Sequence, residues 1–282
     1  MKADRLLPTT SETPIMNGAQ GGIALMSDQT IFALSVDWIP PATSQSTQDA
    51  RAVDRLLKLL AAHRMSATWA LCDRHSLDII QRLAASGQHE VAVLGAAPWS
   101  SAEGSRAAFG SELTRRIGAI QALGLSVQHL VIEGANIPNV DLMLKRGISS
   151  LRCRGLKGDA GRKAKAGQPT SLAYGLHHTP ASQVFQPRPA SWTNLFRKNA
   201  ATQICQGVTQ AREVGWFHCT FTLQHLAHSG DAAWNMLERV LDFVAEHRET
   251  GLLTTTTVSS GLELLTAAQR PVPARSFLRK AA

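Results

Sequence analysis

Acidic and imidazole side chains stand beside the most apolar stretches of the sequence. Asp37 and Glu133 each come directly after a short apolar run, a pattern that predicts a buried strand. His218 lies within the aromatic and β-branched stretch 215–223, another predicted strand. Carboxylates and imidazoles can move protons during a reaction, so Asp37, Glu133 and His218 are candidate catalytic residues.

Basic and aromatic side chains accompany these candidates. Arg152 and Arg154 end the predicted strand 148–151. Guanidinium groups at the end of a strand favour an anionic ligand. Two tryptophans, Trp38 and Trp99, also follow predicted strands, and we expect these four residues to contact a ligand.

Predicted strands and helices alternate along most of the chain, which positions the candidates at one edge. The unit at 66–94 shows the order, with a strand at 66–71, a helix at 76–85 and a strand at 89–94. About eight strands and six or seven helices of this kind predict an α/β fold. The form expected is a distorted (β/α) TIM-like barrel of seven or eight parallel strands in a single domain. A doubly wound open sheet is the alternative, but no glycine-rich phosphate-binding sequence follows any strand.

The carboxyl ends of parallel strands share one edge, where barrel enzymes carry their sites. We therefore expect a common mouth, and the residues expected around it are Asp37, Leu94, Glu133, Arg152 and His218.

Composition predicts three segments. Residues 1–28 are expected to form a flexible leader, 29–268 the barrel and 269–282 a basic tail. The chain has 282 residues and a formal net charge of +8, but much of the excess charge is confined to one loop after Arg152 and to the tail. Neither a regular alternation of basic and aromatic residues nor a known nucleic-acid-binding signature is visible, so a nucleic-acid partner is not expected.

Cellular location follows from cysteines and hydropathy. The four cysteines are widely spaced and form no CxxC pair, which is typical of reduced thiols. The first residues lack a hydrophobic signal core, and no apolar run approaches the roughly 18 residues of a membrane span. We expect a cytoplasmic protein without a membrane span, of undetermined oligomeric state.

Part of the sequence resembles a known family. After the strand at 66–71, the residues Gln88-His89-Glu90-Val91 resemble the second motif of the polysaccharide deacetylases, the NodB-homology carbohydrate esterases of family 4. In that family two later histidines of the motif bind a divalent metal, and they correspond here to Leu94 and Pro98. The family's first motif supplies a pair of aspartates, and only Asp37 of that pair is present, with Trp38 in the second place.

The remaining motifs match in part. The arginine that braces the catalytic base in the family is missing after 127–132, while Leu144-Lys145-Arg146-Gly147-Ile148 resembles the step into the next strand. The family's last motif, a strand that ends in histidine, matches Trp216-Phe217-His218. His89 and Glu90 begin a strand, so we expect a structural role for them at the floor of the barrel.

The resemblance implies a carbohydrate-related protein that has lost its metal ligands. We expect a catalytically degenerate protein that binds a sugar-related or anionic ligand at the mouth, with no metal and no other cofactor. The alternative is an active hydrolase of amide bonds in N-acetylated sugars that uses a rebuilt site of Asp37, Glu133 and His218. His218, His225 and His228 could also form a metal cluster, although their spacing gives this reading little support.

Overall fold

The computed structural model describes most of the predicted barrel segment. The described residues are 29–39, 47–72, 77–95, 99–101, 104–134, 137, 139–154, 167–187 and 199–269. The expected leader, the expected tail from residue 270 and the basic loop 155–166 lie outside these residues.

A curled, mostly parallel sheet forms the centre, as the alternating pattern predicted. Its order is β6-β7-β5-β4-β3-β2-β1-β9-β8, with β10 beside the amino-terminal half of β1, and only the β6–β7 pair is antiparallel. The longer strands are β1 (Thr30–Trp38), β2 (Thr68–Leu71), β3 (Glu90–Leu94), β4 (His129–Glu133), β5 (Ser150–Arg154), β9 (Trp216–Thr222) and β10 (Leu253–Thr256). The molecule is thus a distorted TIM-like barrel in which the sheet forms a half-barrel.

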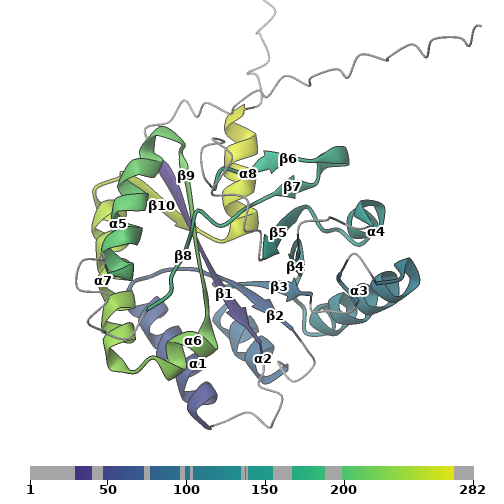
Figure 1. Cartoon of the computed structure of the whole chain (residues 1–282), viewed down its shortest axis with the longest axis horizontal. Coiled ribbons are helices and arrows are strands. Elements are labelled where there is room, and N and C mark those ends of the chain that lie inside the picture. Colours follow the sequence, from purple (N-terminus) through teal and green to yellow (C-terminus); the bar gives the residue numbers. More distant parts are fainter. Residues whose placement is uncertain are drawn as a thin grey trace, which may run out of the picture.

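Helices lie around the outside of the sheet (Figure 1). They are α1 (Thr47–Ala62), α2 (Leu77–Ser86), α3 (Arg106–Gln121), α4 (Val140–Lys145), α5 (Ala200–Gln210), α6 (Leu223–His228), α7 (Asp231–Glu249) and α8 (Val258–Gln269). Each long helix turns an apolar stripe inward. On α1, for example, Val53, Leu56 and Leu60 are at most 1% exposed.

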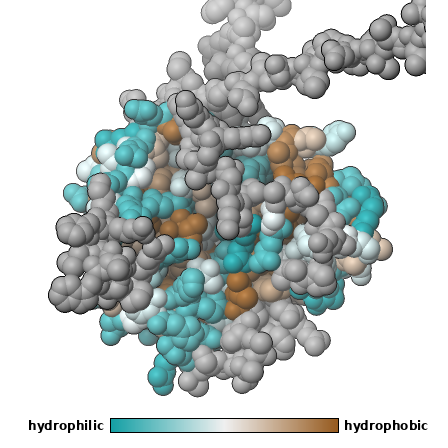
Figure 2. All heavy atoms as spheres, viewed as in Figure 1, coloured by the Kyte–Doolittle hydropathy of each residue, from teal (hydrophilic) through white to brown (hydrophobic). Residues whose placement is uncertain are grey.

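The main core lies between these helices and the outer face of the sheet. A smaller apolar cluster is formed by strand residues of β2, β3 and β4, namely Ala70, Ala92, Leu94 and Val131. On the face in Figure 2 the described surface is mainly hydrophilic, with separate hydrophobic patches. The exposed large apolar residues are Leu77, Tyr174, Val184 and Leu264.

One irregular segment, which we call the closing segment, joins the two edges of the half-barrel and lies between β5 and β9 in sequence. Three two-residue strands mark it, β6 (Thr170–Ser171), β7 (His177–His178) and β8 (Gln183–Val184). β7 pairs with β5 and β8 pairs with β9, so the segment crosses from one edge of the sheet to the other within a few residues. The segment is divided into short strands because its two halves pair with different neighbours.

Candidate functional site

A pocket opens at the carboxyl ends of β1, β5 and β9. Its volume is about 350 Å³. The charged and polar residues that line it come from different elements: Asp37 from β1, Arg152 and Arg154 from β5, Thr220 and Thr222 from β9, and His225 from α6. Gln186, Phe185, Phe221, Val184, Ala181 and Cys153 complete the lining. We call this the carboxyl-end pocket.

An ion cluster occupies the depth of the carboxyl-end pocket. Asp37 and Arg152 are each 3% exposed, and Nη2 of Arg152 donates to Oδ1 of Asp37. Nε of Arg154 lies 3.5 Å from Oδ2 of Asp37. Among the described residues, Nε of Arg152 is buried and donates to no acceptor. The cluster therefore holds two guanidinium groups against one carboxylate.

The ion cluster contains an arginine beside Asp37, although the sequence has no arginine after 127–132, where the resembled family has the one that braces its catalytic base. An arginine does contact Asp37, but it comes from β5 and not from the end of β4. The sequence also predicted that the strand before Arg152 ends at Leu151, whereas β5 continues through Arg154. The strand continues because alternate side chains face the barrel interior, where Asp37 compensates the charge of Arg152.

His218 lies below the carboxyl-end pocket and does not line it. The strand β9 continues to Thr222, so His218 is not at its end. In the register of β1 and β9, Thr222 pairs with Asp37 while His218 pairs with Ala33. Four residues of strand correspond to roughly 13 Å. The expectation that Asp37 and His218 meet at one mouth is wrong for that reason.

The contacts of His218 explain its burial. Nδ1 lies 3.2 Å from the carbonyl oxygen of Pro180, which can only accept, so Nδ1 carries the proton. Nε2 accepts from the hydroxyl of Ser35 at 2.7 Å. Burial, followed by the nearby charge of Arg152, lowers the pKa of His218 to about 3. His218 thus joins β1, β9 and the closing segment as a neutral side chain.

A different histidine lies at the carboxyl-end pocket. His225 is exposed on α6, directly after β9. The neighbouring Gln224 holds this helix to β1, because its side chain donates to the carbonyl oxygen of Ile39 and accepts from the Ile39 amide at 3.4 Å. The sequence signal that could have found His225 is the high β-propensity of the four residues after His218. It places the end of the strand close to His225 and not at His218.

The other predicted site residues lie apart from the carboxyl-end pocket. Glu133 ends β4 with its side chain 52% exposed, and it approaches Nη1 of Arg154 at 3.6 Å. Trp38 is 1% exposed within the main core. Trp99 is 9% exposed and packs on Phe109, with ring centroids 5.6 Å apart. Neither tryptophan therefore offers a surface to a ligand in this structure.

The residues present do not fit the divalent metal of the resembled family. Leu94, at the position of one family ligand, is 1% exposed in an apolar cluster with Ala70, Ala92 and Val131. Pro98 lies outside the described residues. Across the described part of the chain, no three His, Cys, Asp or Glu side chains gather as a metal site. His228 instead approaches Asp49 at 3.8 Å, away from His218.

A second pocket, of about 340 Å³, lies at the amino ends of the strands. Here Nδ1 of His89 accepts from the amide of Ala67 at 3.2 Å, and burial lowers the pKa of His89 to about 4. Glu90 accepts from the amide of Ser259 at 3.2 Å and from the hydroxyl of Thr68 at 2.8 Å. Glu90 therefore fixes the amino end of α8 to the barrel floor and His89 fixes the residues before β2, which is the structural role expected for them.

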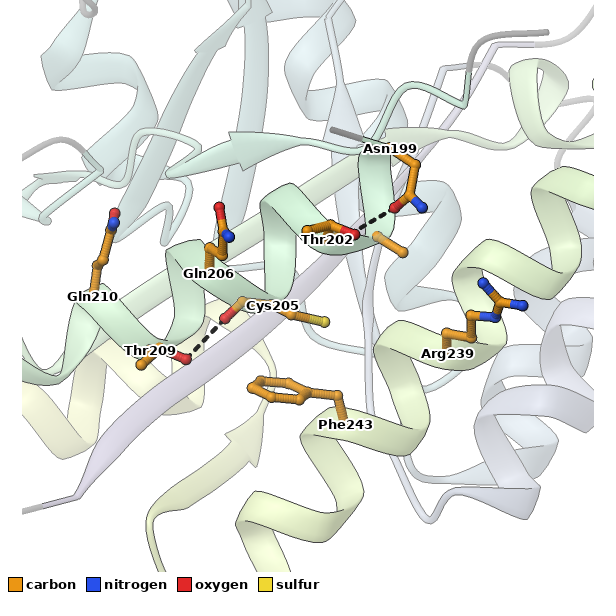
Figure 3. Close-up of a pocket in the computed structure, with 9 residues that line it drawn as sticks. Asn199, Thr202, Cys205, Gln206, Thr209, Gln210, Arg239 and Phe243 are labelled. Atoms are coloured by element: carbon orange, nitrogen blue, oxygen red, sulfur yellow. Dashed lines mark hydrogen bonds between the residues drawn. The ribbon is translucent and has the colours of Figure 1, made fainter. Parts of the chain in front are cut away.

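A larger groove of about 600 Å³ lies on the outer surface between α5 and α7 (Figure 3). Phe243 of α7 points toward α5 beneath Cys205, and Arg239 lies beside the amino end of α5. Thr209 donates within its own helix to the carbonyl oxygen of Cys205 at 3.0 Å, so part of the polar lining is already satisfied. No carboxylate lines the groove beside Arg239. The carboxyl-end pocket is therefore the stronger candidate site.

The helices of the described segments include none with the length and apolar character that a membrane crossing requires.

Comparison with known proteins supports the architecture. No family model matches the sequence, and no curated protein matches it either. Among solved structures, the chain is similar to a proposed polysaccharide deacetylase from Mycobacterium smegmatis, with a TM-score of 0.64 and 17% identity over 87% of this chain and 93% of that one. It is similar to a probable polysaccharide deacetylase from Pseudomonas aeruginosa, with a TM-score of 0.60 and 13% identity over 86% and 93% of the two chains.

Puue allantoinase is similar as well, with a TM-score of 0.58 and 13% identity over 89% of this chain and 93% of that one. At such identities the likeness concerns the backbone alone. The chain therefore has the fold of the polysaccharide deacetylases, at low sequence identity to them.

Proposed function

We propose that the chain is a catalytically degenerate relative of the polysaccharide deacetylases that binds a sugar-related or anionic ligand in the carboxyl-end pocket. The observation that carries this proposal is the burial of Leu94 among apolar side chains, at a position where the resembled family has a metal ligand. The ion pair of Asp37 with Arg152 does not distinguish binding from hydrolysis, since an arginine braces the catalytic base in the resembled family.

The chemistry at Leu94 and at His218 favours binding over catalysis. A metal needs deprotonated N, O or S ligands that converge on it. The apolar side chains of Leu94, Ala70, Ala92 and Val131 offer none at the position where the resembled family binds its metal. His218 is buried and neutral, so it has no access to a reacting group. Binding remains possible because the pocket keeps polar groups and a volume suited to a small molecule.

The second candidate function is hydrolysis of an amide bond in an N-acetylated sugar. It is favoured by one observation, the presence of Asp37 and His225 in the lining of the same pocket. An acid–base pair of that kind would take the place of the expected set of Asp37, Glu133 and His218. A cytoplasmic location is part of the main proposal and rests on the spacing of the cysteines.

One pair of measurements decides between the two functions. Purified protein is incubated with N-acetylglucosamine oligomers, and acetate release is measured with and without a chelator. In parallel, sugars and sugar acids are titrated into the protein by calorimetry. We expect binding without acetate release. Acetate release that disappears in Asp37→Ala but persists in the surface variant Arg212→Gln would establish the hydrolase instead.

A further inference from the structure

The polar groups of the carboxyl-end pocket are unevenly balanced in charge. Asp37 is the only carboxylate among the lining residues described, and it faces both Arg152 and Arg154. Glu133 lies outside the lining and is about half exposed, so water screens its 3.6 Å contact with Arg154. One positive charge in the pocket is therefore left for a ligand to compensate.

The geometry of the guanidinium groups points to a carboxylate. Among the described residues, both ion pairs of Arg154 are long, at 3.5 Å and 3.6 Å, so this side chain keeps capacity for a closer partner. Nε of Arg152 is buried without an acceptor, and burial makes an unmade hydrogen bond costly. Guanidinium groups bind planar carboxylates through paired hydrogen bonds. One uncompensated charge matches a monoanion better than a phosphate dianion.

The rest of the lining requires hydroxyl groups on the same ligand. Asp37 accepts one short hydrogen bond from Arg152, whereas a carboxylate has about four acceptor positions. Thr220, Thr222 and Gln186 add neutral donors and acceptors. A simple carboxylate would satisfy the arginines and leave these groups without partners.

We infer that the ligand is a sugar acid, a single polyhydroxylated ring that carries one carboxylate. This rests on the proposed binding function and names the ligand class of that site. The volume of about 350 Å³ lies near the lower end of the range of about 300–1,000 Å³ for small-molecule sites, which suits one ring and not a long oligosaccharide. Arg154 binds the carboxylate, while Asp37 and Thr222 accept from ring hydroxyls.

Calorimetric titration with four probes tests the inference. The probes are D-glucuronate, D-glucose, acetate and glucose 6-phosphate. Losing one hydrogen bond to a charged group lowers affinity by roughly 10- to 100-fold. We expect glucuronate to bind at least about 10-fold more tightly than each of the others, since each lacks one matched feature.

Variants assign the contacts. Arg154→Gln is expected to remove the preference for glucuronate over glucose. Thr222→Val is expected to weaken the binding of glucuronate and of glucose and to leave the affinity for acetate unchanged. The matched control is Arg212→Gln, which removes one exposed positive charge just before β9, at the opposite end of the sheet, and should leave all affinities unchanged.

The outcomes separate the inference from the proposed function. If glucose, acetate or glucose 6-phosphate binds as tightly as glucuronate and Arg154→Gln weakens it, the sugar-acid inference is overturned while ligand binding at this pocket stands. If none of the four binds, the inference is overturned. If the protein also releases acetate from N-acetylglucosamine oligomers in a chelator-sensitive way, the proposed function is overturned with it.

Discussion

Replacing Asp37 by asparagine should destabilise the protein more than any single change on its surface. Both Asp37 and Arg152 are 3% exposed, and the asparagine keeps the size of the side chain while it removes the charge. Breaking a buried ion pair by removing one partner costs about 3–5 kcal/mol. Arg154 adds a second positive charge nearby, so the upper part of this range is expected for Asp37→Asn. Arg152→Met should cost less, about 3 kcal/mol, because Arg154 still partners Asp37.

The measurement is urea unfolding at pH 7, followed by tryptophan fluorescence and circular dichroism. Trp38, Trp69 and Trp216 are at most 1% exposed, so their emission reports the loss of the core. A loss of 3–5 kcal/mol corresponds to a fall in Tm of about 6–20 °C for a domain of this size. The double variant Asp37→Asn with Arg152→Met should cost clearly less than the sum of the single changes, since neither buried charge is then left alone.

Arg154→Met is the control for the ion cluster. Its side chain is 24% exposed and its contact with Asp37 is long, so the expected loss is at most about 1 kcal/mol. A cost below about 1 kcal/mol for Asp37→Asn, or strict additivity in the double variant, would refute the pairing of Asp37 with Arg152.

Three other outcomes follow from the same geometry. His218→Ala should lower the free energy of unfolding by about 2–4 kcal/mol, because it removes two hydrogen bonds and leaves a cavity. The folded variant should bind ligand with the affinity of the original protein when measured by calorimetry. A large loss of affinity would show that His218 belongs to the site. Stability should fall as pH drops from about 6.5 toward 3, by up to about 1.4 kcal/mol per pH unit from His218 alone, since burial lowers its folded pKa to about 3 and only the unfolded chain takes up the proton. His129 acts in the same direction through its own burial, and urea midpoints between pH 7.5 and pH 4 should show a shallower slope in His218→Ala; equal slopes would contradict the assignment. Leu94→His should cost about 1–3 kcal/mol by placing an imidazole among apolar side chains, without stoichiometric zinc in elemental analysis; one bound zinc per chain would show that Asp37 is available as a ligand.

Local sequence pattern was sufficient for the elements of the barrel. The strand at 66–71, the helix at 76–85 and the strand at 89–94 correspond to β2, α2 and β3 within two residues. These elements follow from side-chain periodicity, which depends on near neighbours in the chain. The position of Asp37 at the carboxyl end of β1, and the structural role of His89 and Glu90, were predicted for the same reason.

The shared edge of the strands predicted that Asp37 and Arg152 lie at one mouth, but only the tertiary structure decided their direct contact and which histidine accompanies them. Asp37 and Arg152 are 115 residues apart, and their contact depends on the curl of the sheet. His218 lies below the pocket that Asp37 lines, because the register of β9 against β1 pairs it with Ala33 and not with Asp37. Strand propensity predicted the extent of this strand, over 215–223, but it does not contain the register against β1 that sets the depth of His218. The sequence therefore determined which residues could do chemistry and that Asp37 and Arg152 share an edge, while the pairing of distant strands determined that His225, and not His218, lines the pocket with them.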